Sequence, residues 1–561
     1  MRLSRNKTKS LFRVVSVITC LIFTLCILSS CAKNSKESNA GPKDTASANS
    51  GKVYFAEDEI NTVDDNYRTC YEIFVYSFYD SNGDGIGDIK GVTEKLDYIN
   101  DGDAATFTDL GCNEIWLMPV MSSPTYHKYD ITDYYSIDAT YGTMEDFESL
   151  LESAHARGIN VIMDLVMNHT STTHQWFLSA AEYLRGLPEG EEADASACPY
   201  VDYYRFNKEG GAGYSPLSGT DWYYEARFWS EMPDLNLDNE AVKAEFKDIC
   251  KFWLDKGVDG FRLDAVTYYE TGNRSKNIEI LNEFNTMVKE IKPDCYVVGE
   301  AYTYSEEYAP YYESGIDSLF DFDFADAKGV IAKTLTGSAS SYGQAVQSVE
   351  EEIAKYSDSY IDAPFLSNHD MARASGYFPG DDGTKLKLAH AMSLLMSGNA
   401  FVYYGEEIGM KGSGKDENKR LAMYWTADGT AEGMCSGPAD ADKTEMKYDA
   451  ADAQAGDPDS ILSFVRSLIR IRNTYPEIAR GKQEFLSDMS DDKICIIKKN
   501  YEGDIAYVVF NISDETVTVD KSSLGEGSIK AALSAGTGEF DTKSFDKDTF
   551  SMPAGSVAVI K

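Results

Sequence analysis

The sequence predicts an α/β protein built on a (β/α)8 TIM barrel, with a small inserted domain after the third strand and a C-terminal antiparallel β-sandwich domain. Two observations lead to this prediction. Eight short apolar runs alternate with helix-like stretches, which is typical of parallel sheets, and eight such units suggest a closed barrel. After the last unit, short runs separated by turns follow one another without helices, which indicates an all-β domain.

The eight predicted barrel strands are continuous apolar runs, as expected for strands that are buried on both faces. They cover residues 71–78, 113–120, 159–166, 258–266, 295–300, 316–322, 361–368 and 400–407. A doubly wound open sheet is the structural alternative.

The segment between the third and the fourth run is too long for an ordinary connection and is rich in Tyr, Trp and Gly. Loops of that size in a compact fold are usually functional, so we predict a small domain beside the barrel mouth. The predicted limits are 1–30 for a lipoprotein signal peptide, 31–52 for a flexible tether, 53–170 and 232–480 for the two parts of the barrel, 171–231 for the inserted domain and 481–561 for the β-sandwich.

The N-terminus has the features of a targeting segment. Five basic residues precede an apolar run from Val14 to Leu28, which fits the hydrophobic region of a signal peptide better than a membrane span. The run ends in "LSSC", which resembles a bacterial lipobox with Cys31 as the lipidated residue. We therefore expect a lipid-anchored protein on the extracellular face of the cell membrane, the alternative being an ordinary signal peptide with a chance cysteine.

Composition narrows the function classes. The formal net charge of −40 argues against nucleic-acid binding, which needs basic patches, and it is compatible with divalent cations and neutral substrates. The chain has 37 Tyr and 26 Phe, which suit both sugar binding and ordinary packing. Seven of the ten cysteines lie outside the signal region, without a CxxC pair, and we expect buried free thiols.

Polar residues stand where the predicted strands end, and in a (β/α)8 barrel the active site lies at the C-terminal strand ends. These residues are Asp164, Asn168, His169, Arg262, Asp264, Glu300, His369 and Asp370. A single one could be a structural strand-end residue, but three carboxylates with two His and one Arg form a specific set.

Such a set suits glycoside hydrolysis, in which one carboxylate attacks the anomeric carbon and another protonates the leaving oxygen. An adjacent Arg keeps the nucleophile ionised, and a carboxyl group shielded from water has a raised pKa and can act as the acid. A third carboxylate can stabilise the transition state, and neutral His side chains can bind sugar hydroxyls.

The segments "DLVMNH", "GFRLDAV", "GEAY" and "FLSNHD" resemble, in order and spacing, the four signature regions of the α-amylase family of glycoside hydrolases. "MPDLN" at 232–236 resembles the intermediary group between oligo-1,6-glucosidases and neopullulanases. The resemblance implies Asp264 as nucleophile, Glu300 as acid/base and Asp370 as transition-state stabiliser. The substrate-binding residues expected around the first sugar are Tyr129, as its aromatic platform, Asp164, His169, Arg262 and His369.

The loop "DSNGDGIGD" after the first predicted strand resembles a calcium-binding loop of oligo-1,6-glucosidase relatives. The resemblance implies a structural Ca²⁺ held by the side chains of Asp80, Asn82, Asp84 and Asp88 and by the carbonyl of Ile86. A Gly/Asp-rich turn without an ion is the alternative.

The leading hypothesis is a lipid-anchored, retaining α-amylase that acts as a monomer on starch and maltooligosaccharides. Tyr126 stands where exo-acting relatives carry an acidic residue, which favours internal cleavage. Aromatic residues of the inserted segment are further candidates for sugar contacts or, alternatively, for that domain's core: Tyr203, Tyr204, Trp222, Tyr223 and Tyr224. Other hypotheses are an α-glucosidase, a neopullulanase-like enzyme, a 4-α-glucanotransferase and, in a different class, a non-catalytic sugar-binding lipoprotein.

Overall fold

The computed structural model describes residues 51–561 except 62, 189 and 526, and these residues belong to one compact unit, Ala48–Lys561. The predicted signal peptide, Cys31 and the tether up to residue 50 lie outside the described residues. None of the helices in the described part combines the length and the apolarity needed to cross a bilayer. The seven cysteines of this part are all buried and free, as expected from their spacing.

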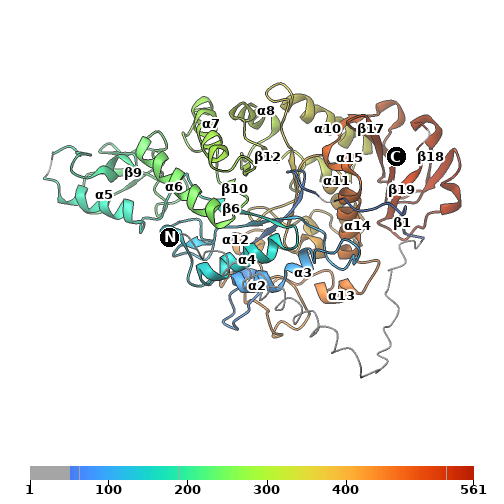
Figure 1. The fold of residues 1–561 in the computed structure, drawn as a ribbon, viewed down its shortest axis with the longest axis horizontal. Coiled ribbons are helices and arrows are strands. Elements are labelled where there is room, and N and C mark those ends of the chain that lie inside the picture. Colours follow the sequence, from blue (N-terminus) through green and yellow to red (C-terminus); the bar gives the residue numbers. More distant parts are fainter. Residues whose placement is uncertain (1–50, 62, 189, 526) are drawn as a thin grey trace, which may run out of the picture. The chain divides into compact units, whose positions relative to one another are not determined.

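An eight-stranded parallel sheet forms the centre of the fold, in the order β13-β12-β11-β10-β6-β3-β2-β14 (Figure 1). The strands follow one another around a nearly closed barrel, with the last strand paired to the first, Ala400 beside Thr69. Each strand overlaps one predicted run: β2 (Thr69–Ile73), β3 (Glu114–Leu117), β6 (Asn160–Leu165), β10 (Gly260–Leu263), β11 (Tyr296–Gly299), β12 (Ser318–Asp321), β13 (Ala363–Pro364) and β14 (Ala400–Tyr403). The (β/α)8 prediction is confirmed, and an open doubly wound sheet is excluded by this order.

Helices connect the strands, and local signals fix several of their ends. Helix α4 (Met144–His155) begins with a capping box between Thr143 and Asp146, and α6 (Glu240–Lys256) ends at Gly257, whose φ of 110° suits glycine. The other helices are α2 (Ile89–Glu94), α3 (Leu96–Ile99), α5 (Gln175–Gly186), α7 (Arg274–Ile291), α8 (Ser305–Tyr308), α9 (Val330–Thr334), α10 (Ala339–Ile353), α11 (Thr384–Leu394), α12 (Asp416–Lys419), α13 (Ala451–Ala455), α14 (Ile461–Thr474) and α15 (Pro476–Arg480).

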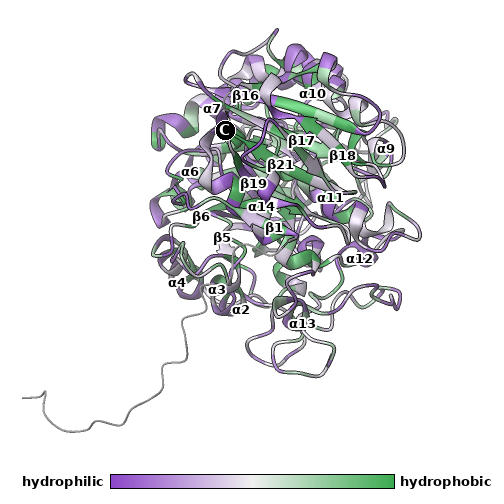
Figure 2. Cartoon of the chain, turned by 90° about the vertical axis from the view of Figure 1, so that its right-hand side faces the viewer, coloured by the Kyte–Doolittle hydropathy of each residue, from purple (hydrophilic) through white to green (hydrophobic). Residues whose placement is uncertain are grey.

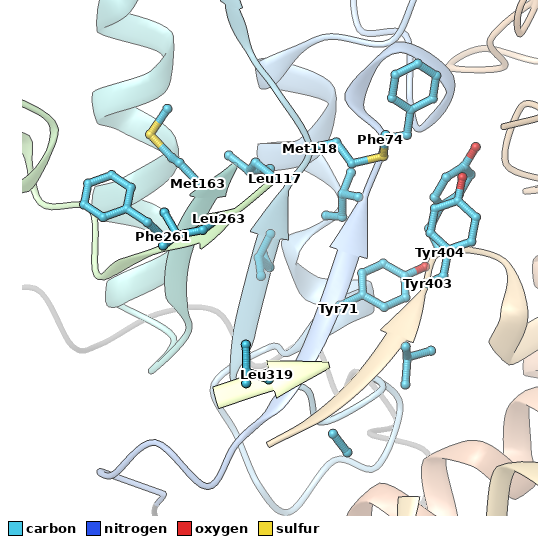
Figure 3. Packing of buried hydrophobic residues seen from close by; sticks show 14 of the residues in the cluster. Tyr71, Phe74, Leu117, Met118, Met163, Phe261, Leu263, Leu319, Tyr403 and Tyr404 are labelled. Atoms are coloured by element: carbon cyan, nitrogen blue, oxygen red, sulfur yellow. The ribbon is translucent and has the colours of Figure 1, made fainter. Parts of the chain in front are cut away.

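The barrel strands are buried on both faces because successive side chains alternate between two cores. Trp116, Phe320 and Phe401 belong to the cluster inside the barrel. Leu117 and Leu319, on the same strands, belong to the outer core together with residues of the helices (Figure 3). This alternation explains why the strand runs are continuously apolar rather than alternately apolar and polar.

The segment after β6 contains α5 and a small antiparallel sheet in the order β7-β9-β8. Its strands are β7 (Phe206–Asn207), β8 (Tyr214–Pro216) and β9 (Tyr223–Glu225), and a separate hairpin of β4 (Met121–Ser122) and β5 (Asp133–Ile137) precedes β6. Tyr203, Tyr204, Trp222 and Tyr224 are 2–7% exposed. The idea that these four rings bind sugars is therefore wrong, because they pack as the core of this segment.

The C-terminal region is antiparallel, as predicted. A six-stranded sheet has the order β1-β19-β21-β17-β16-β15, and β18 pairs with β20. A second core, with Ile496, Val509 and Phe550, lies between these layers, and apolar residues colour β17, β19 and β21 in Figure 2. The strands are β1 (Val53–Phe55), β15 (Lys482–Phe485), β16 (Ile494–Tyr501), β17 (Asp504–Asn511), β18 (Val517–Asp520), β19 (Ile529–Ser534), β20 (Thr549–Met552) and β21 (Ser556–Ile560).

The structure differs from the predicted domain limits at one place. Strand β1, from the start of the segment assigned to the barrel, pairs with β19 in the C-terminal sheet, Val53 beside Leu533. The other limits stay predictions.

Candidate active site

The polar residues predicted at the strand ends come together at one end of the barrel. Asp164 lies near the end of β6, Arg262 and Asp264 at the end of β10, and Glu300 directly after β11. All four are at most 9% exposed. Parallel strands bring their carboxyl ends to the same edge, so residues far apart in sequence become neighbours here.

Arg262 is the centre of this cluster. Its Nη1 donates hydrogen bonds to Asp164 Oδ2 at 2.9 Å and to Asp264 Oδ1 at 2.8 Å, and its Nη2 forms an ion pair with Glu300 Oε2 at 3.0 Å. The guanidinium is fully buried and stacks over the Trp116 ring at 5.0 Å. One cation therefore holds three carboxyl groups in a water-poor site, where electrostatic effects are strong.

The carboxyl groups around Arg262 differ in their tendency to ionise. Burial raises the pKa of Glu300 to about 7, with Arg262 acting against it and Asp264 and Asp370 adding to it. Burial also raises the pKa of Asp164 to about 6 against the same guanidinium. Glu300 can therefore hold a proton near neutral pH, as a general acid must.

Asp264 is held at one oxygen and free at the other. Oδ1 accepts the hydrogen bond from Arg262, and Oδ2 accepts none from the described residues. The next residue, Ala265, has a φ of 51°, a conformation that costs about 1–3 kcal/mol outside glycine and is common at functional sites. Its N–H donates to Glu300 Oε2 at 3.3 Å, which links the two carboxylates through the backbone.

His369 forms a second centre beside the first. Its Nδ1 donates to Glu72 Oε1 at 2.6 Å, and its Nε2 lies 3.1 Å from Asp370 Oδ2 and 2.8 Å from the Tyr129 hydroxyl. Burial alone would lower the pKa of this imidazole, but Asp370 and Glu72 together raise it to about 9. The two acidic neighbours therefore favour the charged form of His369 near neutral pH.

Asp370 is ionised because cations surround it. Arg420 Nη2 donates to its Oδ1 at 2.7 Å, and His369 and Arg420 hold the pKa of this carboxyl well below its usual range despite burial. Sequence reasoning missed Arg420, since it stands in an irregular segment after β14 with no motif around it. Arg420 Nη1 also donates to the Tyr126 hydroxyl at 3.4 Å, so these two residues form one wall of the site.

Tyr129 and His169 complete the predicted set. The Tyr129 hydroxyl donates to Asp164 Oδ2 at 3.0 Å, and its ring stacks on His369 with centroids 5.5 Å apart. His169 also lies within the cluster. Its Nδ1 is 3.3 Å from the side-chain nitrogen of Asn168, and its Nε2 donates to the Tyr129 carbonyl at 3.2 Å. Both ring nitrogens of His169 thus have protein partners, and burial lowers its pKa. Sugar contact by this residue stays a prediction.

Several aromatic rings in the segments that follow the site residues along the chain are exposed. Phe228 and Trp229 are each 47% exposed and Tyr268 is 42% exposed. Phe228 packs against Tyr268 at 4.8 Å and against His169 at 5.6 Å. Tyr302, two residues after Glu300, is 55% exposed. The sequence offered only the general excess of aromatics as a signal for them, because exposure cannot be read from residue type.

The predicted calcium loop folds into a tight turn after β2. The Asp80 carboxylate accepts hydrogen bonds from the N–H groups of Gly83 at 2.6 Å and Gly85 at 2.7 Å. These glycines have φ values of 84° and 90°, which other residues rarely adopt. Asp88 closes the loop by capping α2, where it accepts from Gly91 N–H at 2.7 Å.

The chemistry of this loop fits calcium in part. Asp80, Asp84 and Asp88 accept hydrogen bonds from backbone N–H groups and from the Ser81 hydroxyl, so no basic side chain of the described residues neutralises them. Carboxylate, amide and carbonyl oxygens are the ligands that Ca²⁺ prefers. However, the described residues contain no group of three or more His, Cys, Asp or Glu side chains arranged to hold a metal ion.

Comparison with known proteins agrees with this geometry. The α-amylase catalytic-domain family matches residues 72–481. "Alpha-amylase 3" of Dictyoglomus thermophilum is 38% identical over 79% of this chain and 84% of its own. An oligo-1,6-glucosidase of Heyndrickxia coagulans is 31% identical over 80% of this chain and 92% of its own. The solved structure of Eubacterium rectale Amy13B is 54% identical, with a TM-score of 0.87 over 90% of this chain and 97% of its own. The chain belongs to the α-amylase family of glycoside hydrolases.

Proposed function

We propose that this protein is an α-amylase that cleaves internal α-1,4 bonds of starch and maltooligosaccharides with retention of the anomeric configuration. The observation that carries the proposal is the cluster in which Arg262 contacts both Asp264 and Glu300. Two carboxyl groups on one guanidinium are close together, and a close pair favours the retaining mechanism over the inverting one.

In the first step, Asp264 Oδ2 attacks the anomeric carbon while the proton on Glu300 passes to the glycosidic oxygen, and the bond to the leaving sugar breaks. Arg262 supports this role because its charged hydrogen bond to Oδ1 at 2.8 Å fixes the carboxylate and leaves Oδ2 without a partner among the described residues. The raised pKa of Glu300, about 7, supports its role as the acid. In the second step, Glu300 takes a proton from water, the water oxygen bonds to the anomeric carbon, and Asp264 leaves.

Asp370 is assigned to stabilising positive charge on the sugar in the transition state. Its pKa is held well below the usual range by His369 and Arg420, so it remains an anion throughout the cycle. The Tyr129 ring, fixed by its hydroxyl contacts to Asp164 and His369, is assigned as the platform below the same sugar. A sugar-binding protein without catalysis would not need Glu300, whose pKa is raised, beside Asp370, whose pKa is held low.

Internal cleavage is supported by the aromatic rings outside the cluster. A chain that passes through the site needs flat faces beyond the scissile bond, and the exposed rings of Phe228, which packs against His169, and Tyr268, which packs against Phe228, can supply them. Tyr126, at the position where exo-acting relatives carry an acidic residue, accepts a hydrogen bond from Arg420 instead. The α-glucosidase, neopullulanase-like and 4-α-glucanotransferase activities remain the alternatives within this chemistry.

The test is a time course on soluble starch that follows iodine staining and reducing ends together. We expect staining to collapse while few reducing ends have formed, with maltose and longer maltooligosaccharides as early products. Glucose as the sole early product, with staining lost in proportion to it, contradicts internal cleavage and establishes an exo-acting α-glucosidase.

The remaining parts of the proposal concern the surroundings of the enzyme. We propose a structural Ca²⁺ in the loop of Asp80, Asn82, Asp84, Ile86 and Asp88, where the ion would neutralise the loop and tie it to the start of α2. Lipidation at Cys31 would anchor a monomer at the outer face of the cell membrane, where polymers are met before uptake. The polar stretch between Cys31 and the first strand supports such a tether.

A further inference from the structure

The loop between β4 and β5 carries Tyr129, and a buried lysine stands directly before this residue. The two strands pair as a hairpin, and residues 123–132 connect them. Lys128, within this loop, is only 5% exposed. Lysine is almost never fully buried unless its charge is paired, so the burial of this side chain needs a physical reason.

The backbone of Lys128 is left-handed, with a φ of 65°. This conformation costs free energy for residues with a side chain, whereas glycine adopts it freely. Strained residues of this kind cluster at active sites and ligand clamps. The turn at Lys128 sets the direction in which the chain enters Tyr129. Because glycine would avoid the strain, contacts of the lysine side chain have to offset it.

The ammonium group of Lys128 makes these contacts. Its Nζ forms an ion pair with Asp138 Oδ2 at 2.9 Å and donates a hydrogen bond to the Ser123 carbonyl at 3.2 Å. It also lies 5.3 Å from the centre of the Tyr141 ring, within the range of cation–π attraction. Two acceptors and one aromatic face therefore surround a group with three donors.

These contacts connect Lys128 with the base of the hairpin. Ser123 is the first residue after β4, and Asp138 follows β5 directly. Asp138 is itself fixed, because its Oδ2 accepts from Ser123 N–H at 3.1 Å and its Oδ1 accepts from the Thr140 hydroxyl at 2.6 Å. A well-ordered carboxylate at the base of the hairpin thus holds the residue that precedes Tyr129.

Tyr129 is the link between Lys128 and the catalytic cluster. The Tyr129 ring stacks on His369, with centroids 5.5 Å apart and an angle of 15° between the planes, and its hydroxyl contacts Asp164. Within the described part of the chain, Lys128 forms no hydrogen bond or ion pair with the carboxyl groups assigned to catalysis. The position of the ring matters, since misplacement by about 1 Å can lower a rate about 100-fold.

We propose that Lys128 is a positioning residue, whose buried ion pair with Asp138 holds the Tyr129 ring in place below the reacting sugar. This inference rests on the proposed function, because the platform role of Tyr129 is part of it. The lysine takes no part in a chemical step. It restricts the loop before substrate arrives, so that less conformational freedom is lost when the sugar binds.

The experiment measures kcat/KM on soluble starch in a double-mutant cycle of Lys128→Met and Tyr129→Ala. We expect Lys128→Met to lower kcat/KM by about tenfold or more, and Lys128→Arg, which retains the charge, to recover most of this loss. In the Tyr129→Ala background, Lys128→Met should change kcat/KM by less than about twofold, because no ring is left to position. A merely structural role would lower kcat/KM by the same factor in both backgrounds.

Lys289→Met is the matched control. Lys289 on α7 forms an ion pair of 2.7 Å with Asp317, directly before β12, at the end of the barrel opposite the active site. Its replacement should leave kcat/KM unchanged. If Lys128→Met does not fold, its combination with Asp138→Asn takes its place, because the second change removes the unpaired buried charge. Wild-type kinetics of the Lys128 variant, or a loss that persists in Tyr129→Ala, overturns the inference.

A crystal structure of Lys128→Met separates this inference from the proposed function. We expect the Tyr129 ring to leave its stack on His369 or to occupy several positions. A ring that keeps its wild-type position overturns the inference, whatever the activity. A wild-type protein that does not hydrolyse starch counts against the proposed function, and the position of the ring still decides the inference.

Discussion

Asp370 and Glu72 on β2 together raise the pKa of His369, and the share that Glu72 contributes can be tested directly. The carboxylate lies 2.6 Å from His369 Nδ1, and both side chains are buried. At a charge separation of about 4 Å and an effective dielectric constant of about 20, the pair is worth about 4 kcal/mol, or about 3 pH units. In Glu72→Gln the pKa of His369 should therefore fall from about 9 to about 6, so that the ring becomes neutral at pH 7.5.

The same pair has a consequence for stability. The folded pKa of His369, about 9, exceeds its usual value of 6.5, a difference of about 2.5, which corresponds to about 3 kcal/mol. Because the folded pKa is raised, this stability is fully present below about pH 6.5 and is lost as pH rises through 9. The wild-type protein should lose more stability than Glu72→Gln over this window.

The assay is an NMR titration of the imidazole signals. The chain has only six His, so His369 can be assigned by one substitution. Glu114→Gln is the matched control, since Glu114 is also buried and lies on the neighbouring strand β3. Its carboxylate accepts a hydrogen bond from Asn399 at 2.7 Å and makes none with His369. An unchanged titration of His369 in Glu72→Gln would refute the reasoning, as would an equal change in the control.

Three further predictions concern the proposed function. Asp264→Asn and Glu300→Gln should each lower kcat by several orders of magnitude, because each removes one half of the two-step mechanism. The first product of the wild-type enzyme should be the α-anomer, and an initial β-anomer in the NMR spectrum would contradict the retaining assignment. Chelator should lower the melting temperature of the wild type through lost ligand linkage, and Asp84→Ala should abolish that response; equal responses contradict the calcium site. Cys31→Ser should release the protein from the membrane fraction or leave its signal uncleaved; a soluble wild-type protein whose N-terminus lies away from Cys31 contradicts the anchor.

Much of the fold was accessible from the sequence because its signals are local. Every barrel strand overlaps a predicted run, since strands buried on both faces must be apolar at consecutive positions. The place of the active-site residues followed from the topology of the parallel barrel. Once the strands are parallel, residues such as Asp164 and Glu300 are brought to the same edge wherever they stand in the chain.

Other features could not be predicted because they depend on burial. The rings of Tyr204 and Trp222 were equally compatible with sugar binding and with packing, and only their position under α5 and the small sheet decided for packing. Phe228 and Trp229, a few residues later, have similar chemistry but stay exposed. Residue type reports what a side chain can do, whereas exposure depends on what the rest of the chain places over it.

The sequence by itself determined the order of strands, the residue types at their ends and thereby the class of chemistry, because each of these depends on short-range pattern and on general rules of barrel topology. Only the tertiary structure decided that acidic neighbours raise the pKa of His369, that Arg420 holds Asp370, and that Val53 begins a strand of the C-terminal sheet. These outcomes depend on contacts between residues tens or hundreds of positions apart, and on the loss of water around them, which shifts a pKa according to the charges that remain nearby.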